Sequence, residues 1–311
     1  KLFERIKAVY EKRNSLKLTA EQMRLLEKDY NDFARNGANL DDASQTKLRE
    51  INSKLSLLTL KFNQNVLKET NDFKLVIDNK EDLAGLPQSL IDAAAEDAKA
   101  SNMPNKWIFT LQNPSVMPFL QYSAKRDLRE KIWRAYSMRG NNNNEFDNKK
   151  VIEEIANLRL ERAKLLGYKS HSAYVLAENM AKTPEKVFEL LDKLWTPAIK
   201  MAKKEADEYQ EMINEEGGKF KLEPWDWRYY AEKVRLKKYD LNEEQLRPYF
   251  KLENVRAGIF AVANKLYGIT FKELKNLPVY HKDVVGYEVL NSDGSHLGIL
   301  YMDFFPRDSK R

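Results

Sequence analysis

The C-terminal segment, residues 279–311, constrains the fold most, because it is the longest strand-like stretch in a chain otherwise dominated by helical periods. Apolar, β-branched and aromatic residues fill 279–290 and again 297–305, and a polar turn signal at 291–294 separates the two runs. Two such runs joined by a short turn predict a β-hairpin. Because the second run is apolar on both alternating phases, we expect it to be buried on both faces.

Helical signals fill most of the remaining chain. Thr19 and Gln22 form a capping-box pattern before a helix that ends at Gly37, and apolar periodicity predicts a long helix over 41–70. Another long helix is expected over 184–216, with a proline in its first turn. The chain is therefore predicted to be mainly α with a small β component.

The same patterns divide the chain into three regions, with the four-asparagine loop at 141–144 between the first two. Glycine and proline punctuation around short apolar runs predicts the only other strands. The expected regions are residues 1–140, helical with a short β ribbon formed by 73–77 and 106–111; residues 145–268, built from long helices; and residues 279–311, the β-hairpin.

Composition excludes several classes of protein. The 53 Lys and Arg residues are interleaved with 47 Asp and Glu residues, so the net charge of +6 predicts solvated helix faces and no nucleic-acid partner. No apolar run is long enough for a transmembrane helix, and we expect no membrane partner. The absence of cysteine excludes disulfides and thiolate chemistry. It does not fix the compartment: we favour the cytoplasm, with the periplasm as the alternative.

Metal ligands are scarce, because the chain has only three histidines: His171, His281 and His296. A catalytic zinc needs about three protein ligands, which usually include two histidines at helical spacing. No such pair is present. In the predicted hairpin, His281 and His296 lie on the order of 25 Å apart along the strands. We therefore expect no metal bound by this chain.

Other signatures of catalysis are also missing. The sequence contains no GxSxG nucleophile motif and neither GxGxxG nor GxxxxGK[ST] among its eleven glycines. The residues alone therefore predict a helical scaffold with a terminal hairpin and no complete active site.

The densest aromatic stretch is EPWDWRYYAEKVR at 223–235. A helix that begins at Pro224 would place Trp225 and Tyr229 on one face and Tyr230 on a neighbouring one. These aromatic residues could line a groove for a peptide or a sugar, or pack into a core. We favour the core, and Trp225, Tyr229 and Tyr230 stay candidates for substrate binding.

Several long strings resemble the M3 family of zinc metallopeptidases. They are similar to its bacterial peptidyl-dipeptidases more than to oligopeptidase A or thimet oligopeptidase. The strings are FTLQNPSVMPFLQYS from Phe109, LRLERAKLLGYKSHSAYVLAENMAKTP from Leu158, PWDWRYYAEKVR from Pro224, LRPYFKLENV from Leu246, ANKLYGITF from Ala263 and GSHLGILYMDFFPRDSKR from Gly294.

This resemblance implies a neurolysin-like helical fold with a deep channel and a small sheet beside the active site. Zinc is the cofactor of such enzymes, held by an HExxH motif and a later glutamate. The motif's own glutamate activates the zinc-bound water. The resemblance also implies short peptides as substrates, release of C-terminal dipeptides, and a monomer.

The chain departs from the family pattern because the position of the HExxH motif lies beyond Arg311. The resemblance therefore assigns no catalytic or metal-binding residue to this chain, which we expect to be an inactive internal piece that supplies channel wall and scaffold. Asp303 and Arg307 are expected to be structural ties near the active-site sheet. Two alternatives stay open: an M3 oligopeptidase, and a non-enzymatic helical module that binds peptides or a protein through 225–230.

Overall fold

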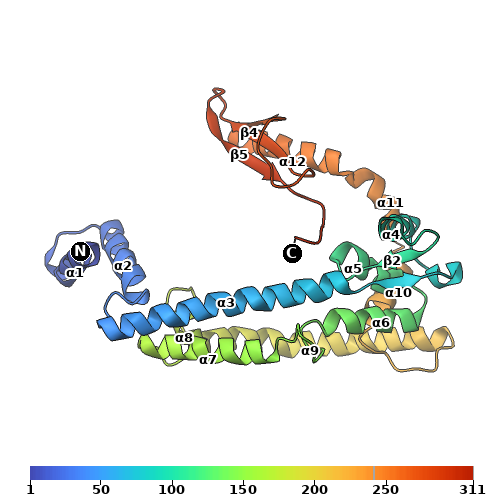
Figure 1. The fold of residues 1–311 in the computed structure, drawn as a ribbon, viewed down its shortest axis with the longest axis horizontal. Coiled ribbons are helices and arrows are strands. Elements are labelled where there is room, and N and C mark those ends of the chain that lie inside the picture. Colours follow the sequence, from blue (N-terminus) through green and yellow to red (C-terminus); the bar gives the residue numbers. More distant parts are fainter. Residues whose placement is uncertain (241, 311) are drawn as a thin grey trace. The chain divides into compact units, whose positions relative to one another are not determined.

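The computed structural model describes residues 1–240 and 242–310 and is mainly helical (Figure 1). Its strands form two small sheets, so the expected fold class is confirmed. None of the helices in the described ranges is long and apolar enough to cross a membrane.

The elements follow in chain order. The helices are α1 Leu2–Glu11, α2 Ala20–Arg35, α3 Asp42–Asp72, α4 Gln88–Ala100, α5 Asn113–Tyr122, α6 Arg126–Ser137, α7 Lys149–Leu165, α8 His171–Leu176, α9 Pro184–Glu215, α10 Trp227–Tyr239, α11 Glu243–Leu246 and α12 Leu252–Tyr267. The strands are β1 Leu75–Ile77, β2 Trp107–Phe109, β3 Thr270–Glu273, β4 Val285–Leu290 and β5 His296–Met302.

The chain forms two compact units, each made of two segments. The first unit comprises Lys1–Glu69 and Met138–Glu205, and the second comprises Thr70–Ser137 and Ala206–Arg311.

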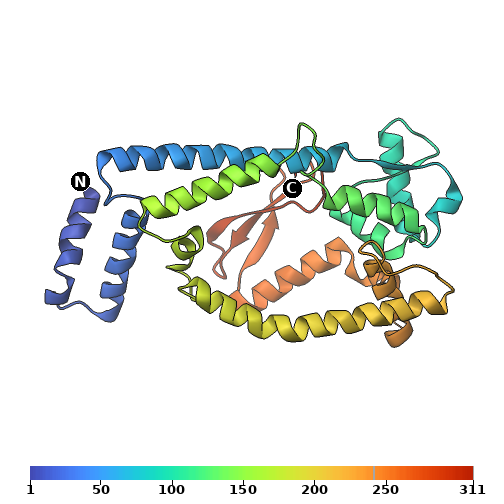
Figure 2. The ribbon, with the colours of Figure 1, turned by 90° about the horizontal axis from the view of Figure 1, so that it is seen from below.

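In the first unit, α3 and α7 lie side by side (Figure 1 and Figure 2). Ile51 and Leu55 of α3 pack against Leu158 of α7 in a small buried cluster. The expected capping box is confirmed at the start of α2, where the Thr19 side chain accepts from the Gln22 N–H and the Gln22 side chain accepts from the Thr19 N–H. The local sequence signal therefore places the start of α2 correctly.

The main core lies in the second unit, around β1 and β2. These strands pair antiparallel within the two ranges where strands were expected, with Val76 opposite Ile108. The rings of Phe109 and Phe119 lie 4.7 Å apart in this core, and both side chains are fully buried together with Ile132 of α6. A second cluster joins the end of α9 to α10.

The C-terminal sheet has the strand order β3-β4-β5. The expected hairpin is confirmed as β4 and β5, which pair antiparallel across a turn at 291–295. Strand β3 was not expected, and β4 begins at Val285, later than the sequence pattern suggested. The stacked rings of Phe260 and Phe271, 4.0 Å apart, pack α12 against this sheet.

The expectation that β5 is buried on both faces is wrong for this structure. Leu297, Ile299 and Tyr301 are 55%, 42% and 42% exposed. The reason is position in the sheet: β3 and β5 flank β4, so β5 is an edge strand with a single neighbour among the described strands. The apolar pattern of β5 therefore does not report burial here.

Candidate functional site

The candidate site is a pocket of about 880 Å³ in the second unit, beside the start of α10. A pocket of this size falls in the range that holds small ligands. Three of the five tryptophans of the chain line it. They are Trp133 of α6, Trp225 in the turn before α10, and Trp227 at the first position of that helix. We call it the tryptophan pocket.

The turn before α10 sets the shape of the pocket. The sequence predicts a helix start at Pro224, but α10 begins at Trp227, so that prediction is wrong. Asp226 occupies the N-cap position, and its N–H donates to the Glu223 carbonyl at 2.9 Å. Trp225 therefore lies in a turn, and the expected helical face shared by Trp225 and Tyr229 does not form.

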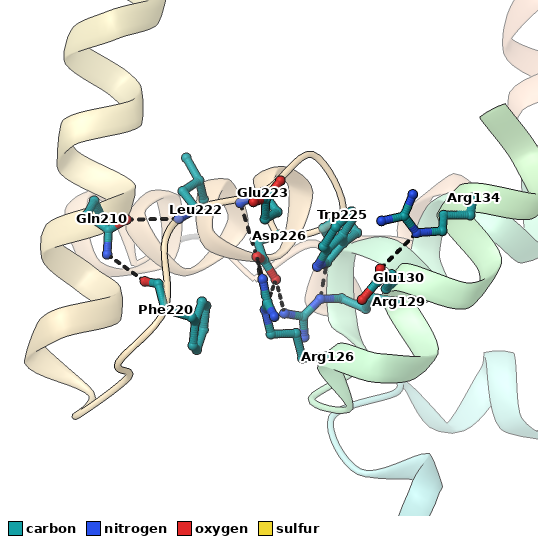
Figure 3. A network of polar contacts seen from close by, with 10 residues as sticks. All are labelled: Arg126, Arg129, Glu130, Arg134, Gln210, Phe220, Leu222, Glu223, Trp225 and Asp226. Carbon is teal, nitrogen blue, oxygen red and sulfur yellow. Dashed lines mark hydrogen bonds and ion pairs between the residues drawn. The ribbon is translucent and has the colours of Figure 1, made fainter. Parts of the chain in front are cut away.

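A buried ion-pair network holds this turn against α6 (Figure 3). The Asp226 carboxylate is 0% exposed and accepts from Arg126 Nη2 at 2.9 Å and from Arg129 Nη2 at 2.7 Å. It also accepts from the Glu223 N–H at 3.2 Å. A buried carboxylate is stable only when it is paired and hydrogen-bonded, and here both conditions are met.

Arg129 is the second fully buried member of the network. Its Nε donates to the Trp225 carbonyl at 3.2 Å and its Nη1 donates to the Ser123 carbonyl at 2.8 Å. Its guanidinium also lies 4.1 Å from the centre of the Tyr229 ring. Arg129 thus joins the turn before α10 to the end of α5, because a guanidinium donates in several fixed directions.

A second polar group lies at the edge of the pocket. Glu232 on α10 pairs with Arg235 at 2.6 Å and accepts from the Gln121 amide at 2.9 Å. The Gln121 contact links α10 to α5. The charges of Glu232 and Arg235 are therefore paired with each other inside the protein.

The three aromatic candidates have different surroundings. Trp225 and Tyr230 are buried, whereas Tyr229 is half-buried. Only Trp225 lines the pocket. Tyr230 packs in the α9–α10 cluster, where burial raises the pKa of its hydroxyl. The rings of Tyr229 and Tyr230 lie 5.1 Å apart, edge to face.

The three histidines have different surroundings. His281 Nδ1 accepts from the Asp283 N–H at 3.3 Å, and His296 Nδ1 lies 3.1 Å from Glu288 Oε1. Burial, followed by nearby Arg159 and Arg162, lowers the pKa of His171. Among residues 1–240 and 242–310, no group of three or more His, Cys, Asp or Glu side chains could hold a metal ion. The described residues therefore do not fit a zinc site.

Asp303 and Arg307 form a bidentate ion pair after β5. The two guanidinium nitrogens of Arg307 lie 2.9 and 2.8 Å from the Asp303 oxygens. The Tyr280 hydroxyl donates to the same carboxylate at 3.0 Å. The hydrogen bonds from Arg307 hold the pKa of Asp303 well below its usual range. This geometry supports the proposal that the pair is a structural tie.

A second buried carboxylate, Glu69, lies in the first unit. It accepts from the Gly140 N–H, from the Asn142 amide at 2.9 Å and from the Asn144 amide at 2.7 Å. The asparagine loop thus folds around an acid at the end of α3. Asn148 joins the same segments, because it accepts from Asn65 at 2.9 Å.

Sequence reasoning did not single out Arg126, Arg129, Arg228 or Glu223. One signal for the network was available: an acid between two tryptophans at 225–227 is out of place in an aromatic core unless it is paired. Its partners could not be identified, because they lie 97 and 100 residues away in the chain.

The known proteins to which this chain is similar all belong to one class, the peptidases. The model of Peptidase family M3 matches residues 119–311. Dipeptidyl carboxypeptidase of Escherichia coli (strain K12) is 38% identical over 99% of this chain and 46% of that protein. Oligopeptidase A of Haemophilus influenzae is 35% identical over 98% of this chain and 46% of that protein. Saccharolysin of Saccharomyces cerevisiae is 29% identical over 93% and 42%. The chain therefore spans just under half the length of these relatives.

Proposed function

Because the chain belongs to peptidase family M3, we propose that it forms part of a zinc-dependent peptidyl-dipeptidase that releases C-terminal dipeptides from short peptides. The observation that carries this proposal is the similarity to Dipeptidyl carboxypeptidase along nearly the whole chain. In this proposal the chain provides scaffold and the wall of a substrate channel.

A second candidate function is that of an oligopeptidase, which cuts within short peptides. It is favoured by the similarity to Oligopeptidase A, which covers nearly as much of the chain at an identity only slightly lower. The two functions differ in whether a free C-terminal carboxylate is needed for cleavage.

The family consists of zinc metallopeptidases, and zinc would supply a Lewis acid and an activated water. Since the described residues do not fit a zinc site, we assign no step of hydrolysis to them. What they offer is a rigid frame: the Asp226 network fixes α6, the turn before α10 and the start of that helix in one arrangement.

A chimera tests the proposal. This chain would replace the matching 46% of the Escherichia coli Dipeptidyl carboxypeptidase, and the chimera would be assayed by mass spectrometry. The substrates are an N-acetylated tetrapeptide and the same peptide with an amidated C-terminus. We expect release of the C-terminal dipeptide from the free acid and little cleavage of the amide.

Equal cleavage of both peptides would favour the oligopeptidase. A folded, zinc-loaded chimera that cleaves neither peptide would overturn the proposed scaffold role. The chain alone serves as the control: we expect no peptide cleavage and no bound zinc after gel filtration. One zinc per chain in elemental analysis would contradict that expectation.

A further inference from the structure

We propose that the tryptophan pocket binds a zwitterionic dipeptide, with an apolar or aromatic side chain against the indoles and the two termini on Arg228 and Glu223. This proposal does not depend on the proposed function, although a dipeptide with two free termini is also the product that the proposed reaction would release.

The apolar part of the pocket is preformed. The rings of Trp133 and Trp225 meet at 5.8 Å with an interplanar angle of 62°, and the Trp227 ring lies 5.0 Å from that of Tyr209, edge to face. Leu222 and Pro224 complete this wall. Trp133 and Trp227 are half-buried and can offer apolar surface to a ligand, whereas Trp225 is only 7% exposed and mainly supports the wall. The entropic cost of binding is low because the positions of these rings are already fixed.

The charged residues that line the pocket indicate which ligand termini it could bind. Arg235 and Glu232 are paired with each other. By contrast, Arg228 and Glu223 are among the residues that line the pocket, and their charged groups have no hydrogen bond or ion pair with any residue that the structure describes. Both side chains are exposed to solvent. One unpaired cation and one unpaired anion therefore lie at the same cavity.

A zwitterion matches this pair of charges better than other ligands do. A guanidinium recognises a carboxylate with charge-assisted hydrogen bonds, and a carboxylate recognises an ammonium group. A purely cationic ligand would compete with Arg134 and Arg126, whose guanidiniums already lie 4.8 and 5.5 Å from the centre of the Trp225 ring. A purely anionic ligand would leave Glu223 facing a like charge.

The pocket volume favours a dipeptide over a free amino acid. About 880 Å³ is at the upper end of the range for small-ligand pockets, which leaves room for two side chains. Binding must displace water from the exposed Arg228 and Glu223, so most of the affinity is expected to come from burial of apolar surface.

The test is calorimetric titration of the whole chain, in the presence of a chelator, with phenylalanyl-leucine and three blocked forms of it. These forms are the C-terminal amide, the N-acetyl peptide and the doubly blocked peptide. Tryptophan fluorescence provides a second readout, because three of the five indoles line the site. We expect each block to weaken binding about tenfold, which is the loss of one charge-assisted contact.

Two variants separate the two termini. Arg228→Gln should weaken binding of the free dipeptide about tenfold, and amidation of the peptide should then cause no further loss of affinity. In Glu223→Gln, acetylation of the peptide should cause no further loss of affinity. The matched control is Arg24→Gln, an exposed arginine on α2 outside the pocket, which should leave binding unchanged. Circular dichroism checks that each variant is folded.

Equal affinity for all four peptides, or no saturable binding of the free dipeptide at millimolar concentration, would overturn the proposal. Because these titrations need neither zinc nor cleavage, their failure would leave the chimera experiment and the proposed function untouched. Conversely, an inactive chimera would say nothing about dipeptide binding by the chain.

Discussion

Asp226 and Glu69 are both buried carboxylates, at 0% and 8% exposure, and they are stabilised in different ways. Asp226 is paired with two guanidiniums, from Arg126 and Arg129. Glu69 accepts from a backbone N–H and two asparagine amides in its loop. The first arrangement brings charges of opposite sign into the interior, and the second surrounds one charge with neutral donors.

The difference lies in what each carboxylate leaves behind when it is removed. Loss of Asp226 would leave one fully buried guanidinium without a counter-ion, and desolvation of an unpaired charge is expensive. Loss of Glu69 would leave amide donors on a loop that water can reach. The Asp226 network should therefore support the fold of the second unit, whereas Glu69 should mainly order one loop in the first.

The largest effect is expected from Asp226→Ala. Removal of the acid should lower the free energy of unfolding by about 3–5 kcal/mol, because Arg129 is left buried and unpaired. Urea unfolding followed by circular dichroism measures the loss. Asp127→Ala, an exposed acid on α6, is the control and should change stability by less than about 0.5 kcal/mol. A loss below about 1 kcal/mol for Asp226→Ala would remove the contrast with Glu69.

A smaller effect is expected from Glu69→Ala, about 2 kcal/mol, because neutral donors lose less than a charge when their acceptor is removed. The loss should be local: amide hydrogen exchange should accelerate at 140–144 and stay slow in the core around β1 and β2. Glu69→Gln keeps one acceptor oxygen, so its free energy of unfolding should lie between those of Glu69→Ala and the unchanged protein. Equal acceleration throughout the chain would show that this acid supports more than its loop.

The smallest effect is expected at Asp303, whose partner Arg307 is close in the chain. Because its folded pKa is depressed, the stabilisation is fully present above the ordinary Asp pKa of about 3.9 and is lost as the pH falls through the folded value. Asp303→Asn should therefore destabilise the protein at pH 7, and the difference from wild type should shrink as the pH is lowered below about 4. A difference that grows with acidification would contradict the ion-pair geometry.

Local signals carried most of what the sequence predicted correctly. The Thr19 capping box and the hairpin depend on residues close together in the chain, and each strand of the short β ribbon is marked by an apolar run of its own. Strand β3 was missed because only one of its four residues, Phe271, is apolar. It belongs to the sheet by pairing with β4, from Thr270 opposite Leu290 to Glu273 opposite Tyr287, and so short and polar a strand leaves no apolar pattern in the sequence.

The candidate site was found only in part. Aromatic density pointed to Trp225, Tyr229 and Tyr230, but spacing could not show that Trp225 lies in a turn. The polar residues of the pocket were out of reach for a different reason. The sequence cannot show whether Arg228 has an ion-pair partner, because any of the 47 Asp and Glu residues could pair with it or with another base. Only the folded chain decides these pairings.

The edge position of β5 has a consequence for solubility. Among the described strands it pairs on one side only, it exposes three large apolar side chains, and it contains no Asp, Glu, Lys or Arg between His296 and Met302. Natural sheets usually protect such edges with a charge, a proline or a bulge. Here the β4–β5 pairing has a register irregularity between Val289 and Leu290, beside the turn, and pairs regularly from there to Met302. We therefore expect this edge to promote aggregation in concentrated solutions, edge strand against edge strand, and a lysine in place of Ile299 is the change that would oppose it.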